Sequence, residues 1–193
     1  MKKIYAFDFD GTLTTKDTLI EFIRYAKGSI ALGLGFLRYA HLLVMMKIGL
    51  YPNYKAKQKV FAHFFKDTTL DDFNALCKEF AASSRHLLRP NAIEAIDQAT
   101  KEGSEVLIVS ASIDNWVQPF FPQVKVLGTQ IEVIDGKLTG RFMTKNCYGQ
   151  EKVNRILSLH PNRQEYHLTA YGDSRGDREM LAFADESYFK PFR

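Results

Sequence analysis

Two carboxylates near the N-terminus are the residues whose type and spacing point most directly to chemistry. Asp8 and Asp10 close an apolar, β-branched and aromatic segment, 3–9, and Gly11 follows them at once. The segment predicts a buried strand, which fixes the direction of both carboxylates. Gly11 permits the turn that brings backbone N–H groups inward. An Asp-Gly-Thr triplet alone is usually only a turn, so Asp8 and Asp10 predict a functional site only together with other polar residues that lie beside them.

Other polar residues follow later strands of the chain. Ser110 comes after the apolar stretch 105–109, and Asp173 comes after the stretch 166–171. The carboxyl ends of parallel strands share one edge of a sheet, so these side chains are expected beside the N-terminal pair. Three carboxylates a few ångströms apart raise one another's pKa values unless a cation lies between them. Oxygen ligands without His or Cys favour magnesium over zinc, so the pattern predicts a magnesium site.

The chain after residue 89 alternates between strand and helix patterns. Short apolar strands are separated by stretches in which apolar residues recur three and four positions apart. The predicted strands are 105–109, 124–127, 166–171 and 186–189, and the predicted helices are 92–101, 151–159 and 177–183, with a helical stretch near Trp116. A hairpin is predicted at 131–139 from its Asp-Gly turn signal. This alternation predicts an α/β fold, a Rossmann-like parallel sheet core with helices on both faces.

A segment with only helical spacing lies between the first strand and this alternating part. Residues 17–84 contain no comparable strand. Breaks at Gly28, 51–53 and 67–69 divide them into about four helices. The segment therefore predicts a small all-helical cap inserted after the first strand. The expected domains are a catalytic core formed by 1–14 and 89–193 and a cap formed by 15–88.

Four short motifs follow one another along the chain. They are the Asp-x-Asp-x-Thr stretch at Asp8, Ser110 after a strand, Lys152 at the start of a helix, and Gly-Asp-Ser-Arg-Gly-Asp at 172–177. Singly, Ser110 can simply end a strand and Lys152 can be a solvated helix residue. Jointly they make coincidence improbable, and their order and spacing resemble the haloacid dehalogenase (HAD) superfamily of phosphohydrolases over nearly the whole chain. The helical insertion resembles the cap of subfamily IB, which contains phosphoserine phosphatase.

The resemblance implies a two-step mechanism with an aspartyl-phosphate intermediate. Asp8 would attack phosphorus, and Asp10 would protonate the leaving oxygen and then activate water. Mg²⁺ would be held by Asp8, the main-chain carbonyl of Asp10, and Asp173. Asp177 would be an outer ligand that orients the waters of the metal. The residues implied at the phosphoryl group are Ser110, Lys152, Thr12, Phe9, Gly11 and Ala111.

The cap is expected to choose the substrate, because the motifs handle only phosphate and metal. Asp17 and Lys59 stand where phosphoserine phosphatases generally have a glutamate and an arginine for the ammonium and carboxylate of the substrate. A lysine does not form the two parallel hydrogen bonds by which an arginine binds a carboxylate. Ala111 and Ser112 also replace a typical pair of glycines. Free phosphoserine is therefore an open alternative and not the favoured substrate.

A second resemblance points toward a lipid phosphate. Residues 146–153, Asn-Cys-Tyr-Gly-Gln-Glu-Lys-Val, are similar to the stretch around the motif lysine in the bacterial phosphatidylglycerophosphate phosphatase branch of the superfamily. The apolar helix predicted within 29–50 carries Arg38 and His41 on one face and could lie at a membrane surface to admit a glycerol phosphate head group. The favoured interpretation of 29–50 is a helix packed within the cap, because its methionines and leucines are ordinary packing residues.

Composition and charge narrow the class of partner. The chain of 193 residues is 46% hydrophobic and 25% charged, as expected of a folded globular protein. Its net charge of +4 is concentrated in the cap, but no zinc-finger spacing or aromatic RNA-binding signature points to nucleic acid. Two distant cysteines and no signal peptide predict a cytoplasmic location, with peripheral contact at the inner membrane surface left open. The expected partner is a phosphorylated small molecule or lipid, and no obligate protein partner is indicated.

Two classes of function stay open at this point. The favoured class is a magnesium-dependent phosphomonoester hydrolase, although transfer of the phosphoryl group to an acceptor other than water is also compatible with the motifs. The rival class is a non-catalytic or regulatory phosphate-binding protein whose basic cap engages an acidic partner or a membrane. A degenerate binder would usually have lost the acid-base group or the metal ligands. This chain keeps all of them: Asp8, Asp10, Lys152, Asp173 and Asp177.

Overall fold

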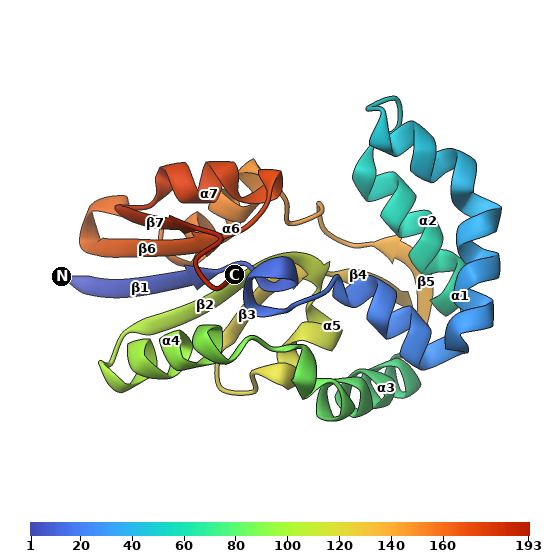
Figure 1. Ribbon diagram of the computed structural model, residues 1–193, viewed down its shortest axis with the longest axis horizontal. Helices are drawn as coiled ribbons and strands as arrows, with labels where there is room; N and C mark the ends of the chain where they lie inside the picture. Colours follow the sequence, from blue (N-terminus) through green and yellow to red (C-terminus); the bar gives the residue numbers. More distant parts are fainter.

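A five-stranded parallel sheet forms the centre of the computed structural model, which describes residues 1–193 (Figure 1). The strand order is β3-β2-β1-β6-β7, and every neighbouring pair runs parallel. The strands are β1 (Lys2–Phe7), β2 (Glu105–Ile113), β3 (Lys125–Thr129), β6 (Tyr166–Gly172) and β7 (Glu186–Phe189). Because β1 lies between β2 and β6, the first motif meets the motifs that follow those two strands.

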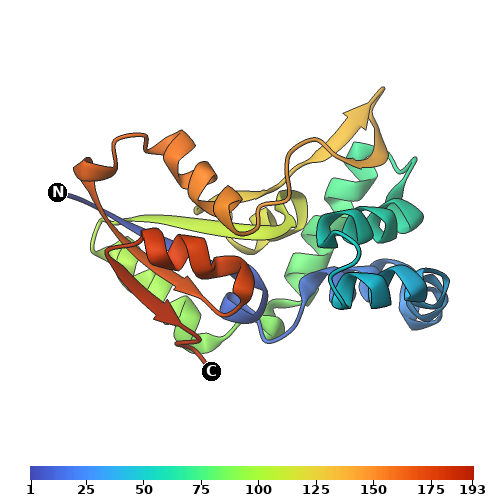
Figure 2. The same cartoon turned by 90° about the horizontal axis from the view of Figure 1, so that it is seen from above.

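Helices cover both faces of this sheet, as Figures 1 and 2 show. The covering helices are α4 (Pro90–Lys101) on one face and α6 (Gln150–Leu159) with α7 (Arg178–Phe183) on the other. Along β1, Ile4 and Ala6 belong to the core under α6 and α7, whereas Phe7 belongs to the core that includes α4. Strands buried on both faces require apolar residues at successive positions, which explains their continuous apolar runs. The predicted Rossmann-like α/β fold is confirmed.

The ends of the first two strands differ from their apolar patterns. β1 ends at Phe7, where the pattern predicts Phe9, and β2 runs to Ile113, where the pattern predicts Val109. Phe9 is buried in the turn that follows β1, and its ring centroid lies 5.6 Å from that of Phe120. A buried side chain can therefore belong to the core from a turn, so the apolar run overestimates the length of β1, whereas the run at 105–109 underestimates the length of β2.

The insertion after β1 is helical, as predicted. Its helices are α1 (Thr18–Lys47), α2 (Asn53–Phe65) and α3 (Leu70–Ser83). Gly28 interrupts α1 with φ of +83° and ψ of 163°, so the helix has two halves. Aromatic rings join the first half to the core, where Phe22 stacks on Trp116 of α5 (Asp114–Val117) with 5.1 Å between ring centroids. This packing fixes the start of the cap above the end of β2.

A two-stranded hairpin, β4 (Ile131–Ile134) and β5 (Lys137–Phe142), stands against the helical insertion (Figure 2). Both turn residues have positive φ, as the Asp-Gly signal predicts. Main-chain hydrogen bonds tie β5 to the link between α2 and α3, from Asp67 N to Leu138 O at 2.8 Å and from Leu138 N to Thr68 O at 2.9 Å. The hairpin is thus a neighbour of the cap helices in space, although it lies within the core segment of the sequence.

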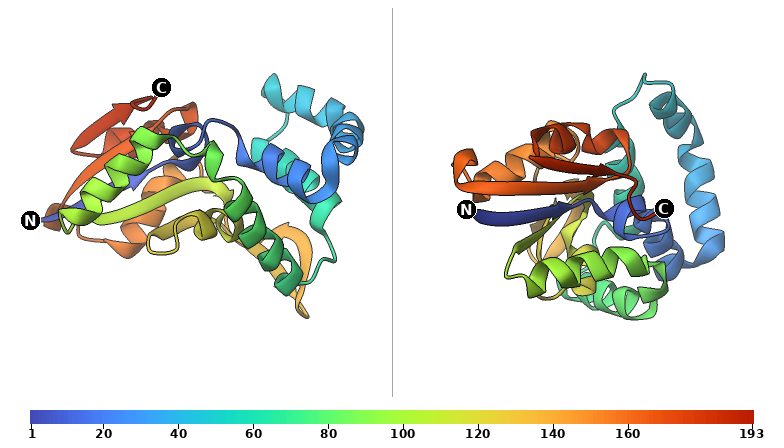
Figure 3. Two further views of the ribbon diagram at one scale, coloured as in Figure 1. Left: turned by 60° about the horizontal axis from the view of Figure 1, so that its bottom comes forward. Right: turned by 60° about the vertical axis from the view of Figure 1, so that its left-hand side comes forward.

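The second half of α1 departs from the prediction of a packed cap helix. Within 29–50 only Leu32 and Gly35 are buried, and most other side chains face solvent. The favoured interpretation of this segment is therefore wrong for most of its length. The reason is that α2 packs against one side of the helix, while the opposite side forms the outer edge of the molecule (Figure 3).

Candidate active site

Asp8 directly follows β1 at the carboxyl edge of the sheet, as predicted. Its backbone N–H donates to Tyr171 O at 2.9 Å, and the chain then turns through Phe9–Leu13. Gly11 has φ of +82° in this turn, and a Cβ built on it would lie 2.5 Å from Asp173 Oδ2. A larger residue at position 11 would therefore strain the turn and push it away from the carboxylates.

A buried lysine joins Asp8 to Asp177. Lys152 Nζ lies 2.6 Å from Asp8 Oδ1 and 2.6 Å from Asp177 Oδ1. Thr12 Oγ1 donates a 3.1 Å hydrogen bond to Oδ2 of Asp8. Lys152 is 1% exposed and Asp8 is 6% exposed, so each charge depends on the other for compensation. These contacts bring Lys152 and Thr12 beside the predicted nucleophile.

Burial and charge act on this network in opposite directions. Burial raises the pKa of Asp8 to about 7, although the Lys152 ammonium opposes the rise. Burial would lower the pKa of Lys152, but Asp8 and Asp177 outweigh it and raise that pKa above its usual value. Burial would raise the pKa of Asp177, yet Lys152 and hydrogen bonds from Ser174 hold it below its usual value. Lys152 is therefore charged at neutral pH and can offset negative charge on a phosphoryl group.

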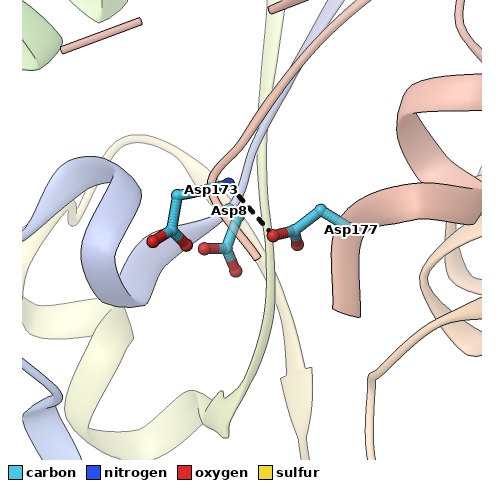
Figure 4. A group of neighbouring side chains, drawn as sticks. All are labelled: Asp8, Asp173 and Asp177. Atoms are coloured by element: carbon cyan, nitrogen blue, oxygen red, sulfur yellow. Dashed lines mark hydrogen bonds between the residues drawn. The ribbon is translucent and has the colours of Figure 1, made fainter. Parts of the chain in front are cut away.

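Three carboxylates converge beside this network (Figure 4). Asp8, Asp173 and Asp177 each offer an oxygen, and these oxygens lie within 4.8 Å of one another. Asp173 Oδ1 is buried without a hydrogen-bond partner, while Oδ2 contacts the Arg193 guanidinium. A buried acceptor without a donor fits a bound cation, and an all-oxygen set fits a hard divalent ion such as Mg²⁺. The carboxylate of Asp10 lies outside this group.

Asp177 is also built into the loop that follows β6. Its Oδ2 accepts hydrogen bonds from the backbone N–H groups of Asp173, at 3.1 Å, and Ser174, at 2.9 Å. Figure 4 shows the first of these bonds, which draws the backbone of Asp173 toward Asp177. Since Oδ1 of Asp177 faces Lys152, both of its oxygens are engaged. Asp177 therefore orients both Asp173 and Lys152 toward Asp8.

Asp10 is held by residues from the cap and from β2. Its Oδ1 accepts from the N–H and the hydroxyl of Thr18, at 2.7 Å and 2.6 Å, and its Oδ2 accepts from the Ser112 hydroxyl. Trp116 Nε1 donates to Thr18 Oγ1 at 3.2 Å and fixes the orientation of that hydroxyl. The sequence predicts none of these contacts of Asp10. Only Ser112 carried a signal, because the strand period of two puts it on the same side as Ser110.

The end of β2 supplies the second motif to the same edge of the sheet. Ser110 is buried, and its Oγ accepts a 3.0 Å hydrogen bond from the Ser112 N–H, which leaves its O–H able to donate to a phosphoryl oxygen. Lys57 of α2 reaches across from the cap and donates to the Ala111 carbonyl at 2.6 Å. Burial lowers the pKa of Lys57, while Asp10 and Asp17 oppose that shift. Lys57 thus connects the cap to the candidate phosphate site.

These groups open into a pocket of about 540 Å³ between the core and the cap. Its charged floor consists of Asp8, Asp10, Ser110, Lys152, Asp173 and Asp177. Its apolar wall comes from α1 and α2 and consists of Leu19, Ile20, Phe36, Leu43, Met46 and Val60. A small number of converging polar groups within an apolar enclosure is typical of a site for a small ligand.

The structure brings only some of the predicted cap residues to this pocket. Asp17 lines it and caps α1, accepting a 3.0 Å hydrogen bond from the Leu19 N–H. Lys59 is exposed and does not line the pocket, and Lys57 takes that place. Arg38 and His41 are also exposed and do not line the pocket. The substrate contacts predicted for these three residues are therefore corrected, because their helices turn them toward solvent.

The phosphate-site residues predicted from the first motif contribute in different ways. Gly11 lines the pocket, whereas Phe9 packs its ring into the aromatic core and leaves only backbone groups near Asp8. Thr12 is buried and contacts Asp8 rather than lining the pocket itself. The turn therefore supports the carboxylate from below and exposes backbone at Gly11.

Comparisons of the sequence with known proteins agree with this arrangement. Residues 5–182 match the model of the haloacid dehalogenase-like hydrolase family. The chain is 35% identical to protein CicA of Caulobacter vibrioides over 201 residues, which cover 98% of this chain and 86% of CicA.

Solved structures share the fold. A Bordetella pertussis protein of unknown function has a TM-score of 0.81 at 18% identity, covering 97% of this chain and 89% of that chain. A HAD family hydrolase from Salmonella enterica serovar Typhi has a TM-score of 0.72 at 18% identity, covering 94% and 60%. A substrate-bound phosphoserine phosphatase has a TM-score of 0.64 at 21% identity, covering 98% and 86%.

Proposed function

Because the chain belongs to the haloacid dehalogenase-like hydrolase family, we propose that it is a magnesium-dependent phosphomonoester hydrolase that acts through an aspartyl-phosphate on Asp8. The observation that carries the proposal is the position of Asp8 on the pocket floor, held by Thr12 and Lys152 and followed by Asp10. A non-catalytic phosphate binder would need neither a poised carboxylate nucleophile nor a second carboxyl group fixed by three hydrogen bonds.

Two displacements at phosphorus account for the roles of these groups. In the first, a carboxylate oxygen of Asp8 bonds to phosphorus as the bond to the alcohol oxygen breaks, and Asp10 gives its proton to that oxygen. In the second, Asp10 takes a proton from water, the water oxygen bonds to phosphorus, and the bond to Asp8 breaks. Phosphate and free Asp8 result. The Ser112 hydroxyl can donate a hydrogen bond to the Asp10 carboxylate and can accept one from the Asp10 carboxylic acid.

The remaining floor residues stabilise the phosphoryl group. Lys152 supplies positive charge beside Asp8, and the Ser110 hydroxyl supplies a hydrogen-bond donor from the end of β2. Asp8 and Asp173 would hold Mg²⁺, with Asp177 keeping Asp173 in position. When bound, Mg²⁺ neutralises charge on the phosphoryl oxygens and helps to align them with Asp8.

The apolar wall of the pocket indicates which class of substrate the site favours. A phosphomonoester bound on the floor would direct its alcohol part toward Phe36, Leu43 and Met46. We therefore favour a phosphorylated small molecule or a lipid head-group phosphate whose alcohol part carries apolar surface. Phosphoserine is the second candidate, since Asp17 and Lys57 together offer one negative and one positive group for an amino acid.

Phosphate release measured with Mg²⁺ over a panel of phosphomonoesters tests the proposal. The panel contains p-nitrophenyl phosphate, glycerol phosphate, phosphoserine, and phosphatidylglycerophosphate in mixed micelles, with Asp8→Asn as the control. Turnover of at least one ester, lost in Asp8→Asn, is the expected result. Mass spectrometry of acid-quenched enzyme should find one phosphoryl group on the peptide that contains Asp8. Absence of release from every ester, with Mg²⁺ still bound, would favour the phosphate-binding class.

A further inference from the structure

The outer side of the second half of α1 is apolar and uncovered. We define the outer stripe by four side chains with exposed fractions of 59 to 82%: Ile30, Leu34, Leu37 and Val44. Their spacing of three, four and seven positions puts them on one face of the helix. The same helix half packs Leu32 and Gly35 inward and turns Phe36, Leu43 and Met46 toward the pocket. This half is therefore apolar on two opposite faces, and only one of them has a partner within the molecule.

The charges in the sequence segment that contains the outer stripe have a single sign. Between Glu21 and Asp67 the chain contains no Asp or Glu. The same interval contains eight basic side chains: Arg24, Lys27, Arg38, Lys47, Lys55, Lys57, Lys59 and Lys66. Apart from Lys57, which reaches the pocket, all of them are exposed. An apolar stripe edged by cations is complementary to a surface that is apolar inside and anionic outside.

We propose that the outer stripe and its flanking cations dock the protein peripherally on an anionic lipid surface. The apolar side chains would enter the boundary between head groups and acyl chains, and Arg38, Lys47 and their neighbours would meet lipid phosphates. The proposal does not depend on which phosphomonoester is hydrolysed, because the pocket opens on the other face of the helix.

Two other ways of covering the outer stripe, membrane spanning and dimer formation, fit the observations less well. α1 is long and apolar enough to cross a bilayer, with mean hydropathy 1.5 in its most apolar window. If α1 spanned a bilayer, Arg38 and His41 would lie near the bilayer centre. The inner face of α1 would also have to leave α2, against which it packs so closely that a Cβ on Gly35 would lie 2.3 Å from Phe64 Cζ. A second copy of the chain would bring two sets of cations together with no acidic residue between 22 and 66 to offset them.

Vesicle co-sedimentation of the full chain tests the proposal. The probes are vesicles of phosphatidylcholine alone and vesicles of equal parts phosphatidylcholine and phosphatidylglycerol. We expect binding to the anionic vesicles that weakens as salt is added. The double variant Leu34→Gln with Leu37→Gln should bind the anionic vesicles at least roughly 10-fold more weakly, because two large apolar groups no longer enter the lipid. The matched control is Ile134→Gln with Leu159→Gln, two exposed apolar residues outside the cap helices, and it should bind as the unmodified chain does.

Activity and folding are measured separately from docking. Release of phosphate from soluble p-nitrophenyl phosphate should be equal in the unmodified chain and both double variants, and their thermal unfolding curves should coincide. A failure of the proposed hydrolase activity would leave the vesicle result and the unfolding curves unaffected. The proposal is overturned if the unmodified chain stays in the supernatant with both vesicles, or if the Leu34/Leu37 variant binds as well as the control. It is also overturned by protein that resists alkaline carbonate extraction from membranes, or by a dimer that this variant dissociates.

Discussion

The charged floor and the apolar wall of the pocket differ in how completely their residues are held. On the floor, Lys152 contacts two carboxylates, and Asp10 accepts three hydrogen bonds from Thr18 and Ser112. The wall is made of apolar side chains from α1 and α2, and the second half of α1 is covered on only one side. If the proposed function holds, the closely held floor would perform the reaction and the wall, which has fewer contacts, would select the substrate.

The most severe way to test this division is to remove the nucleophile. Asp8→Asn keeps the shape of the side chain but not its charge, so kcat should fall by at least about 10⁴-fold. Phosphate release with Mg²⁺ measures the loss, and circular dichroism checks that the variant is folded. Retention of more than a small fraction of activity would remove Asp8 from the role of nucleophile.

Removal of the metal should come next in size. Chelation, or Asp173→Asn, should lower kcat by ~10³-fold, because several kcal/mol of charge stabilisation is lost. A readout independent of activity is thermal unfolding. Mg²⁺ that binds only the folded chain should stabilise it by about 2.7 kcal/mol at a concentration 100 times its dissociation constant. The Asp173→Asn chain should show no such stabilisation, and an equal response in both chains would contradict the predicted site.

Lys152→Met tests whether the floor is one connected unit. The change should lower kcat by about 10²- to 10³-fold, as the loss of one preorganised stabilising group does in other enzymes. It should also lower the free energy of unfolding by about 3 kcal/mol, because Asp8 and Asp177 lose their buried partner. Lys55→Met, at an exposed position of α2, is the matched control and should change neither quantity measurably. An intact free energy of unfolding in Lys152→Met would show that the network is not a structural unit.

Thr18 links the floor to the cap and should give a smaller effect. Thr18→Val removes the hydroxyl between Asp10 and Trp116 and leaves the buried Trp116 N–H without an acceptor. We expect kcat to fall roughly 10-fold, and the free energy of unfolding to fall by about 1 to 3 kcal/mol. Thr18→Ser retains the hydroxyl and should recover most of kcat. If valine and serine variants have the same kcat, Thr18 does not position Asp10.

The smallest effect is expected on the substrate side. Lys57→Gln should raise KM several-fold for an anionic substrate with little change in kcat, since it removes a charge that binds substrate and transition state alike. Lys59→Gln, two positions along the same helix, should leave both parameters unchanged. Equal effects of the two substitutions would contradict the placement of Lys57 in the pocket and restore the position predicted from the sequence.

The reactive floor was predictable because its residues carry local signals. Asp8, Ser110 and Asp173 follow apolar runs that predict strands, and parallel strands must deliver their carboxyl ends to one edge. The order of the motifs resembled the HAD superfamily, and the match over residues 5–182 confirms that membership. The cytoplasmic location and the boundaries of the cap stay predictions.

The residues of the apolar wall were harder to predict. Helical spacing shows which side chains share a face of a helix, but it does not show which element packs against that face. Lys57 and Lys59 lie about 200° apart around α2, so the rotation of one packed helix decides which of them enters the pocket. The contact of Asp10 with Ser112 joins segments 102 residues apart, and its contact with Thr18 reaches across a turn. The only sequence signal for either contact was the strand spacing of Ser112 from Ser110.

By itself the sequence determined the parallel sheet, the edge at which the motifs meet, and the carboxylate oxygens that gather there. These follow from apolar period, strand direction and side-chain chemistry, which act over a few residues. Only the tertiary structure decided that the hairpin stands with the cap, that Lys57 replaces Lys59, and that the outer face of α1 has no partner in the molecule. Those outcomes depend on how many elements surround a helix and at what rotation, and packing settles both only when the whole chain is folded.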